Sequence, residues 1–305
     1  MFTIKQLRYL VAIADQLHFR RAAEIMHVSQ PTISGQLREM ELKLGGQLVE
    51  RSRSNVLMTP LGKEIVARAR IILGEIEAIS DIAIRGRESL SGTFRLGILS
   101  TLGPYLLPHI LPSLHERYPD LRLYIREGMP DAQVQDLEDG KLDLLVFPLP
   151  INRTDIETVR LFREPLLVVV PKEHRLATKR AVRREDLRGE TVLALARGHR
   201  LHDQVHDLCE EYNANMSLDF EGTSLDTLRQ MVSMGLGISF LPMLYVLAET
   251  EGDQSVAVIP INRNSPNRVI GLAWRRQSSH RKDYQELARF IRDAMRDVPR
   301  ITGLS

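Results

Sequence analysis

The stretch FRRAAEIMHVSQPTISGQL, residues 19–37, decides the fold of the N-terminal part of the chain. Its spacing predicts a short helix from about Arg20 to Met26 and a second helix that begins at Pro31. Proline suits the first turn of a helix because it has no N–H to leave unpaired. Ser29, two positions earlier, is a residue type that caps helix N-termini. Two helices joined by so short a break are typical of a helix-turn-helix.

The flanking sequence extends this motif on both sides. Residues 4–17 repeat apolar side chains at intervals of three and four, which predicts a first helix with one buried face. The helix after Pro31 is expected to end at Gly45-Gly46, because glycine readily adopts the left-handed cap conformation. Residues 47–58 read as two short extended pieces around a polar tip, so a wing is predicted after the helix-turn-helix.

A long helix is predicted from Pro60 to about Ser89, followed by a hinge at residues 90–92. Its apolar stripe is too long to stay exposed on a free helix, so it needs a partner surface. We expect that partner to be the same helix of a second subunit, and packing on the chain's own C-terminal part is the alternative. The stripe consists of Leu61, Ile65, Ala69, Ile72, Ile76, Ile79 and Ala83.

From Thr93 to Phe147, short apolar strands alternate with helices, which indicates an α/β architecture with parallel strands. A second α/β stretch is predicted at residues 166–260, with a returning strand at 269–274 and a last helix at 282–298. Two α/β lobes that face each other leave a cleft between them, and ligands commonly bind in such clefts.

Composition narrows the functional classes. No apolar run reaches the roughly 18 residues of a membrane span, and the N-terminus lacks the layout of a signal peptide, so a cytoplasmic protein without membrane contact is expected. The single cysteine, Cys209, excludes an intramolecular disulfide and a cysteine-based zinc cage. The net charge is only +2, but residues 1–60 hold eight Lys and Arg against five Asp and Glu, which leaves +3 and makes this segment the basic part.

Other functional classes lack their signatures. The sequence contains no phosphate-binding glycine loop, zinc-protease histidine pair or serine-nucleophile elbow, so no catalytic residue and no cofactor are predicted. His202 and His206 lie four apart on one predicted helix, but no third metal ligand is in view, and no metal site is predicted. A transport-type solute-binding protein would share the two-lobed fold, but the helix-turn-helix and the absent signal peptide argue against it.

Several motifs together resemble those of the LysR-type transcriptional regulators. They are Ala22-Ala23, Ser29-Gln30-Pro31, Ser34, Leu48–Arg51 and Thr59–Gly62. Within that family the sequence is most similar to the peroxide-sensing OxyR branch. The stretches that carry this similarity are His18–Arg21, Gly103–His109, Gly198-His199 and Thr223–Leu225. The resemblance covers essentially the whole chain.

This resemblance implies a winged helix-turn-helix DNA-binding domain in residues 1–59, a dimerising linker helix in 60–89 and an effector-binding domain in 90–305. The last domain would be of the periplasmic-binding-protein type, with two Rossmann-like lobes. Lobe I is expected at about 90–163 and 268–305, and lobe II at about 164–267. The resemblance also implies binding to double-stranded promoter DNA, contact with RNA polymerase, and assembly into homodimers and homotetramers.

The exposed face of the recognition helix is expected to read bases in the major groove, while nearby arginines contact phosphates. Gln30 suits adenine and Thr32 suits the methyl group of thymine, whereas Gly35 is too small for a side-chain contact. The predicted DNA-contacting residues are Arg20, Arg21, Ser29, Gln30, Pro31, Thr32, Ser34, Gln36, Arg38, Arg51 and Arg53.

The OxyR resemblance breaks down at the reactive thiol. OxyR-type sensors carry a reactive cysteine in a Gly-His-Cys-Leu stretch and a second cysteine some nine residues on, whereas residues 198–201 here read Gly-His-Arg-Leu. Arg200 therefore takes the reactive position, and Cys209 matches the partner. Met129-Pro130 is a second departure from the branch. Without two thiols no internal disulfide can store a signal, so peroxide sensing by that mechanism is not expected.

Cys209 is itself expected to be a buried structural cysteine. Asp207, Glu210 and Glu211 surround it in the sequence, and negative neighbours should raise the pKa of the thiol and slow its oxidation. A redox-responsive regulator that acts through Cys209 and an effector-independent regulator remain the alternatives.

A small anionic effector is expected in the cleft. Thr101 and Thr223 precede helices whose N-termini attract anions, and Arg200 begins a third helix, where a cation is unfavourable without a negative partner. Pairing of Arg200 with Asp203 is the alternative. In the predicted site, His199 is expected to have a hydrogen-bonding, structural role. The predicted effector-binding residues are Ser100, Thr101, Leu102, Met129, Phe147, His199, Arg200, Thr223 and Ser224.

Overall fold

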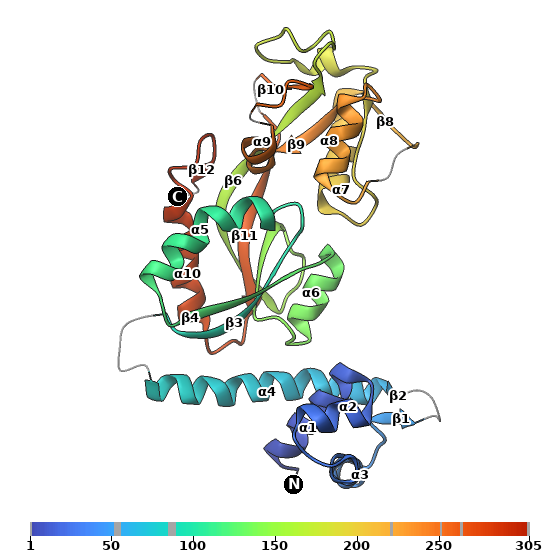
Figure 1. The fold of residues 1–305 in the computed structure, drawn as a ribbon, viewed down its shortest axis with the longest axis vertical. Helices are drawn as coiled ribbons and strands as arrows, with labels where there is room; N and C mark the ends of the chain where they lie inside the picture. The colour runs from blue at the N-terminus through green and yellow to red at the C-terminus, as the bar shows by residue number, and fades with distance from the viewer. Residues whose placement is uncertain are drawn as a thin grey trace. The chain divides into compact units, whose positions relative to one another are not determined.

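The structure is a computed structural model that describes residues 2–51, 56–84, 90–219, 222–250, 252–262 and 265–303. The chain divides into two compact units, residues 1–89 with 136–142 and residues 90–135 with 143–305 (Figure 1). The predicted combination of a helical N-terminal part with a larger α/β part is confirmed.

The first unit is a helix-turn-helix followed by a hairpin and a long helix. Its core is built from apolar side chains that recur every three or four residues on the helices, such as Leu10, Ile13, Ile33, Leu37 and Met40. The elements are α1 (Ile4–Gln16), α2 (Phe19–Ile25), α3 (Gln30–Leu44), β1 (Val49–Arg51), β2 (Val56–Met58) and α4 (Pro60–Ile84).

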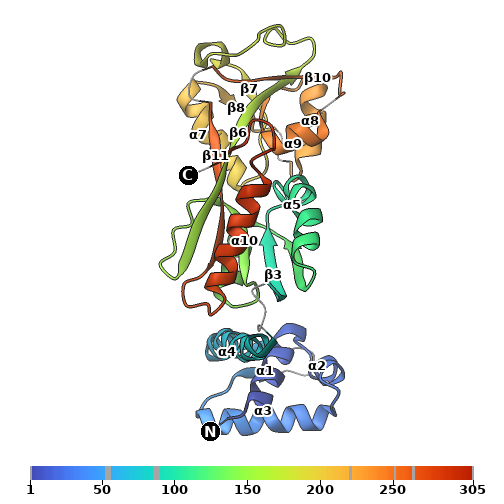
Figure 2. The same ribbon diagram turned by 90° about the vertical axis from the view of Figure 1, so that its left-hand side faces the viewer.

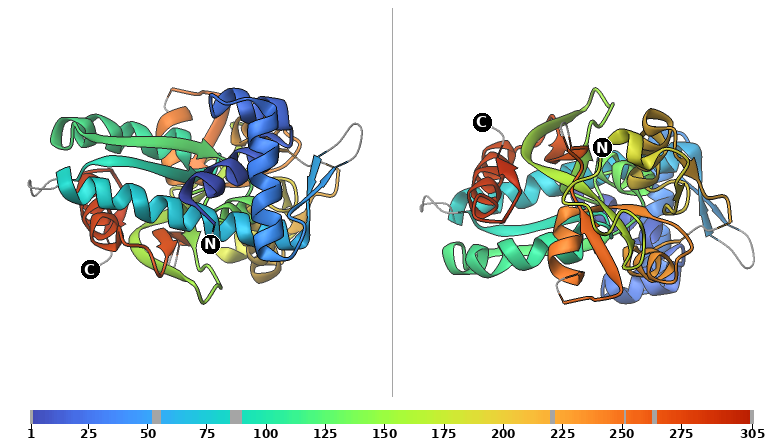
Figure 3. Two further views of the ribbon diagram at one scale, coloured as in Figure 1. Left: turned by 90° about the horizontal axis from the view of Figure 1, so that it is seen from below. Right: turned by 90° about the horizontal axis from the view of Figure 1, so that it is seen from above.

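The predicted signals set the two ends of α3. The Ser29 hydroxyl oxygen accepts the N–H of Thr32 at 3.3 Å and so caps the helix. Gly45 ends it with φ at 72°, in the left-handed region that glycine adopts without strain. The antiparallel strands β1 and β2 form the predicted wing beside α3 (Figure 3, left). Arg53 and the side chain of Arg51 lie outside the described residues, as do residues 85–89 at the predicted end of the long helix.

The second unit carries the remaining elements, apart from the end of α6, which falls in the segment 136–142 of the first unit. They are β3 (Gly92–Ile98), α5 (Gly103–Arg117), β4 (Leu121–Glu127), α6 (Pro130–Glu138), β5 (Leu144–Leu149), β6 (Ile156–Pro171), a 3-10 turn (Arg184–Leu187), β7 (Thr191–Val192), α7 (Arg200–Tyr212), β8 (Asn215–Met216), α8 (Leu225–Ser233), β9 (Ser239–Pro242), α9 (Met243–Glu249), β10 (Val256–Ile259), β11 (Asn267–Arg275), α10 (Arg281–Ala294) and β12 (Thr302–Gly303).

The main sheet of the second unit contains both parallel and antiparallel pairs of strands. Its order is β10-β6-β11-β5-β3-β4, with β9 and β12 added at β6. Strand β3 pairs parallel with β4 and β5, which confirms the parallel strands predicted within residues 93–147, and β7 pairs parallel with β8. Strands β6 and β11 pair antiparallel, although the elements β7–β10 and α7–α9 lie between them along the chain.

Strand β6 passes from one lobe to the other, and β11 re-enters the first lobe beside it (Figure 2). The first half of β6 pairs with β11, and its second half pairs with β9 and β10. We call the part around β3, β4, β5, α5, α6 and α10 lobe I, and the part around β7–β10 and α7–α9 lobe II. Residue 164, the expected start of lobe II, therefore lies within a continuous strand.

Candidate functional site

The recognition helix α3 divides its residues between a core face and an exposed face. Ile33, Leu37 and Met40 are at most 2% exposed and hold the helix against α1 and α2. The residues between them carry no such packing role, so the exposed face is available for DNA. Gly35 has open space around the position that a Cβ would take.

The structure leaves most of the predicted DNA-contacting residues exposed to solvent. Ser34 and Gln36 are half-buried, and the exposed residues are Arg20, Arg21, Ser29, Gln30, Pro31, Thr32 and Arg38. Some are held by neighbours: Arg20 pairs with Glu24 at 3.2 Å, Gln36 donates to Glu39 at 3.3 Å, and the hydroxyls of Ser29 and Thr32 are 2.7 Å apart. Arg51 ends β1, and Arg53 lies outside the described residues.

The wing is anchored at its base by residues that the sequence reasoning missed. Glu41 of α3 accepts the N–H groups of Leu48 and Val49 at 2.9 and 3.2 Å with one carboxylate oxygen. Thr59 caps α4 by accepting the N–H of Gly62 at 2.9 Å and donates to the carbonyl of Gln47 at 2.8 Å. These bonds hold the recognition helix, the wing and the start of α4 as one body.

Helix α4 is also tied to α1. Arg70 is buried, with its side chain 8% exposed, and pairs with Asp15. A guanidinium in that position needs its partner, because an unpaired buried charge is costly. The first half of α4 thus belongs structurally to the DNA-binding part.

In the second unit, a fully buried ion pair lies where β6 and β11 pass between the lobes. Glu164 on β6 accepts from Arg268 on β11 at 2.6 Å and from the N–H of Leu244 at 2.9 Å. Arg268 donates to the carbonyl oxygen of Thr101 at 2.9 Å and to its hydroxyl at 3.4 Å. The charged pair is at most 1% exposed. Thr101 precedes α5 of lobe I and Leu244 lies in α9 of lobe II, so the network joins both lobes.

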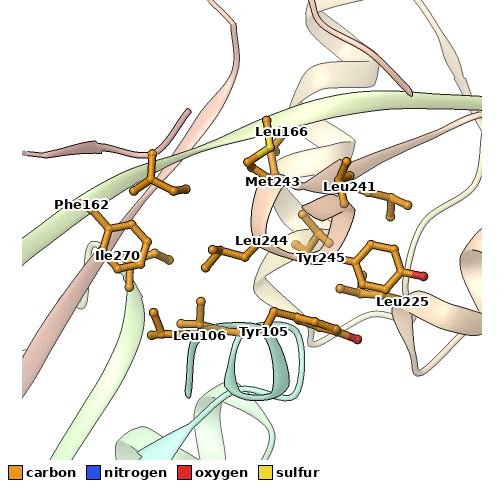
Figure 4. Packing of buried hydrophobic residues seen from close by; sticks show 14 of the residues in the cluster. Tyr105, Leu106, Phe162, Leu166, Leu225, Leu241, Met243, Leu244, Tyr245 and Ile270 are labelled. Atoms are coloured by element: carbon orange, nitrogen blue, oxygen red, sulfur yellow. The ribbon is translucent and has the colours of Figure 1, made fainter. Parts of the chain in front are cut away.

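Aromatic packing continues this connection (Figure 4). Leu244 lies among buried side chains that come from β6, β11 and α5. Tyr105 of α5 meets Tyr245 of α9 edge to face, with ring centroids 5.1 Å apart. The Tyr245 hydroxyl donates to Asp226 and accepts from Arg229. We call this set of contacts, with the Glu164–Arg268 network, the interlobe seam.

Three predicted effector residues are therefore part of the packed interior. The Thr101 hydroxyl, predicted to face the cleft, is buried and faces Arg268. Leu102 and Phe147, predicted as an apolar wall, are 0% and 3% exposed. Arg268 and Glu164 had no local signal in the sequence, because partners 104 positions apart meet only in the folded chain.

Other predicted residues meet where α7 begins. Arg200, half-buried, donates to the carbonyl of Pro150 in lobe I at 2.8 Å. Met129 is 44% exposed, and its terminal methyl lies 3.4 Å from where a Cβ on Gly198 would stand. Asp203, the alternative partner of Arg200, lies 3.3 Å from the His202 ring instead. His199 is buried, and burial, followed by the nearby His202, lowers the pKa of its imidazole.

The remaining predicted hydroxyls are exposed. Ser224 caps α8 by accepting the N–H of Thr227 at 3.2 Å, and Thr223 and Ser100 lie on the surface. The N-terminus of α5 already has a carboxylate beside it, since Glu127 lies 2.9 Å from the Cβ position of Gly103. Sequence reasoning missed Glu127, which lies 24 residues away along the chain.

Cys209 is buried on the core face of α7, as predicted. Burial raises the pKa of its thiol to about 11. The predicted direction is confirmed but the cause differs, because withdrawal from water and not the acidic neighbours produces the shift. Within the described ranges, no three His, Cys, Asp or Glu side chains gather as a metal site would require. No helix in those ranges is long and apolar enough to cross a membrane.

Comparison with known proteins accounts for both units. Residues 4–63 match "Bacterial regulatory helix-turn-helix protein, lysR family", and residues 87–296 match "LysR substrate binding domain". The chain is 42% identical over 292 residues to "DNA-binding transcriptional dual regulator OxyR" of Escherichia coli, covering 96% of this chain and 95% of that one. It is 37% identical to "Hydrogen peroxide-inducible genes activator" of Haemophilus influenzae, covering 97% and 98%.

Solved structures agree over the full length. A full-length OxyR of Pseudomonas aeruginosa, in which one cysteine is replaced by aspartate, superposes with a TM-score of 0.82 at 36% identity, covering 96% of this chain and 98% of that one. A cysteine-to-serine mutant of Corynebacterium glutamicum OxyR with bound hydrogen peroxide gives 0.68 at 32% identity, covering 97% and 93%. With an N-terminal winged helix-turn-helix, a two-lobed second unit and both family matches, the chain belongs to the LysR family of DNA-binding transcription regulators and is a homologue of OxyR.

Proposed function

We propose that this LysR-type regulator is controlled by a small anionic effector that binds beside Arg200, between the two lobes, and not by an intramolecular disulfide. The unneutralised charge of Arg200 carries the proposal. Its guanidinium donates to a neutral carbonyl, and no carboxylate in the described part of the chain pairs with it. The dipole of α7 disfavours a cation at this end, so an added anion would be stabilising.

The position of Arg200 also suggests how binding would be transmitted. Arg200 lies in lobe II and its hydrogen-bond partner, Pro150, lies in lobe I. An anion that engages the guanidinium would change the strength of this interlobe contact. An effector acts only if it prefers one of two arrangements, and a contact that it strengthens or replaces supplies that preference.

The predicted effector set is retained in this proposal with altered roles. Arg200 would bind the anion, with the exposed hydroxyls of Ser100, Thr223 and Ser224 as candidate donors. Met129 and His199 would flank it. Thr101, Leu102 and Phe147 would support the site from the buried side.

The wider architecture of the proposal follows the family. Residues 1–59 would bind promoter DNA, residues 60–89 would dimerise, and residues 90–305 would bind the effector. Homodimers would assemble into homotetramers on DNA and contact RNA polymerase. Because the chromosome is its target, the protein would act in the cytoplasm.

A peroxide response is suggested by the names of the relatives but receives less support. The chain has one cysteine, so an internal disulfide has no partner. That cysteine is buried, and burial raises its pKa, so little nucleophilic thiolate is present near pH 7.

The test is thermal unfolding of the full-length protein with a panel of small metabolite anions and with hydrogen peroxide. A ligand at about 100 times its Kd adds roughly 2.7 kcal/mol of stability. We expect one class of anion to raise Tm and Arg200→Ala to abolish the rise. Arg188→Ala, which removes an exposed arginine elsewhere in lobe II, is the control and should respond as the wild type does. An unchanged response of Arg200→Ala to every anion would contradict the proposal.

A further inference from the structure

Lobe II contains a cavity whose lining residues take no part in the proposed site at Arg200. It has a volume of about 490 Å³, within the roughly 300–1,000 Å³ of typical small-molecule sites. One wall is the exposed face of α7, with His202, Asp203, His206 and Asp207. The opposite face of that helix is packed in the core, so this wall is held in place.

The other walls combine an apolar floor with a single cation. Ala194 and Leu195, which are 2% exposed, and Met216 provide apolar surface. Leu218 also lines the cavity and is 88% exposed, so a ligand with an apolar group would remove its side chain from water. Arg197 lines the cavity as well, from the segment between β7 and α7.

Two side chains of opposite charge in this lining have no partner among the described residues. Among the described residues, neither the Arg197 guanidinium nor the Asp207 carboxylate has an ion pair or a side-chain hydrogen bond. Asp203 is partly engaged, 3.3 Å from His202. A ligand with only a negative charge would be repelled by the two aspartates, and a ligand with only a positive charge would be repelled by Arg197. These side chains do not form a cluster of three or more ligands that could hold a metal ion.

We infer that this cavity binds a small zwitterion with an apolar side group, of the amino-acid class. Its carboxylate pairs with Arg197, its ammonium group pairs with Asp207, and its apolar group covers the floor and Leu218. Charge-assisted hydrogen bonds at both ends satisfy charges that are otherwise left to water. Because α7 also carries Arg200, a ligand here stabilises the helix from which the interlobe contact is made.

The experiment is isothermal titration calorimetry of the full-length protein with L-leucine as the probe. Two analogues each lack one charge: 4-methylpentanoate has no ammonium group, and 3-methylbutylamine has no carboxylate. L-Leucine should bind saturably, and each analogue should bind at least tenfold more weakly. Asp207→Asn and Arg197→Gln should each weaken L-leucine binding at least tenfold. Glu210→Gln, also exposed on α7 but outside the cavity, is the matched control and should bind as the wild type does.

The outcomes separate this site from the one at Arg200. Arg200→Ala should lose the response to anions and keep L-leucine binding, so either proposal can fail alone. The zwitterion assignment is overturned if L-leucine, L-methionine and L-phenylalanine all fail to bind, or if an analogue with one charge binds equally well. It is also overturned if both cavity variants bind like the wild type, or if Arg200→Ala abolishes L-leucine binding.

Discussion

Arg200 and Cys209 lie nine residues apart on one helix, yet their surroundings give them opposite properties. Arg200 stands at the first turn and reaches Pro150, so its charge faces the region between the lobes. Cys209 points into the core with Leu208 and Tyr212. A charged side chain at an interface can respond to ligands, whereas a thiol withdrawn from water stays protonated and unreactive.

The burial of Cys209 controls how fast its thiol reacts. Burial disfavours the thiolate and moves the pKa from 9.0 to about 11, so the native thiol needs a higher pH to react. At pH 8, alkylation by iodoacetamide should be roughly a hundredfold slower in the native protein than in urea. Between pH 9 and 11 the unfolded chain releases this proton first, so this group lowers stability as pH rises.

Intact mass spectrometry over time measures the alkylation, and Cys209→Ser should give no adduct in either state. Similar rates in native buffer and in urea would show that the thiol is accessible, and the redox alternative would then regain support.

Among the elements of the first unit, the wing and α4 meet at Gly62. A Cβ at this position would lie 2.0 Å from the carbonyl oxygen of Leu48, which belongs to the backbone and cannot rotate away. Gly35, on the recognition helix, has nothing within 4 Å of its Cβ position. The same substitution therefore has opposite consequences at two glycines of one domain.

Gly62→Ala should destabilise the first unit by about 1–3 kcal/mol, since the wing must separate from α4. Gly35→Ala should stabilise it by up to about 1 kcal/mol, because alanine favours the helix. Hydrogen–deuterium exchange of peptides from residues 2–51 measures both effects. Equal protection in Gly62→Ala and the wild type would show that the wing is not held against α4 in solution.

In the molecule as a whole, the interlobe seam decides which parts of the second unit can move. Breaking the buried Glu164–Arg268 pair leaves an uncompensated charge, whereas the Arg200–Pro150 bond is exposed to water and single. The side with α5 and α9 is therefore expected to stay closed, and motion between the lobes should occur beside α7.

Glu164→Gln should lower the free energy of unfolding of the second unit by about 3–5 kcal/mol. Glu157→Gln on the same strand removes a surface pair with Arg281 and should cost no more than about 1 kcal/mol. Urea unfolding followed by fluorescence reports this unit alone, because the single tryptophan, Trp274, is buried on β11. Equal losses in the two variants would argue against the seam.

Helix α4 has exposed isoleucines that could form a dimer interface. Ile72 and Ile79 on α4 are 42% and 66% exposed, and they lie seven residues apart on one face. If this face forms the dimer, Ile72→Asp should shift the full-length protein toward monomer in sedimentation velocity. Lys63→Asp is the control. It places an aspartate on the opposite side of α4 from Ile72 and should leave the dimer intact. A dimer unaffected by Ile72→Asp would place the interface elsewhere.

The sequence alone determined the helix-turn-helix, its caps at Ser29 and Gly45, the wing, the long helix and the missing reactive thiol. These depend on neighbours within a few positions, where periodicity, capping and residue type act directly. The passage of β6 through both lobes, its antiparallel pairing with β11 and the burial of Thr101 were decided only by the tertiary structure. Glu164, Arg268, Thr101 and Leu244 come from four separate segments, and no local pattern records which distant group satisfies a buried charge.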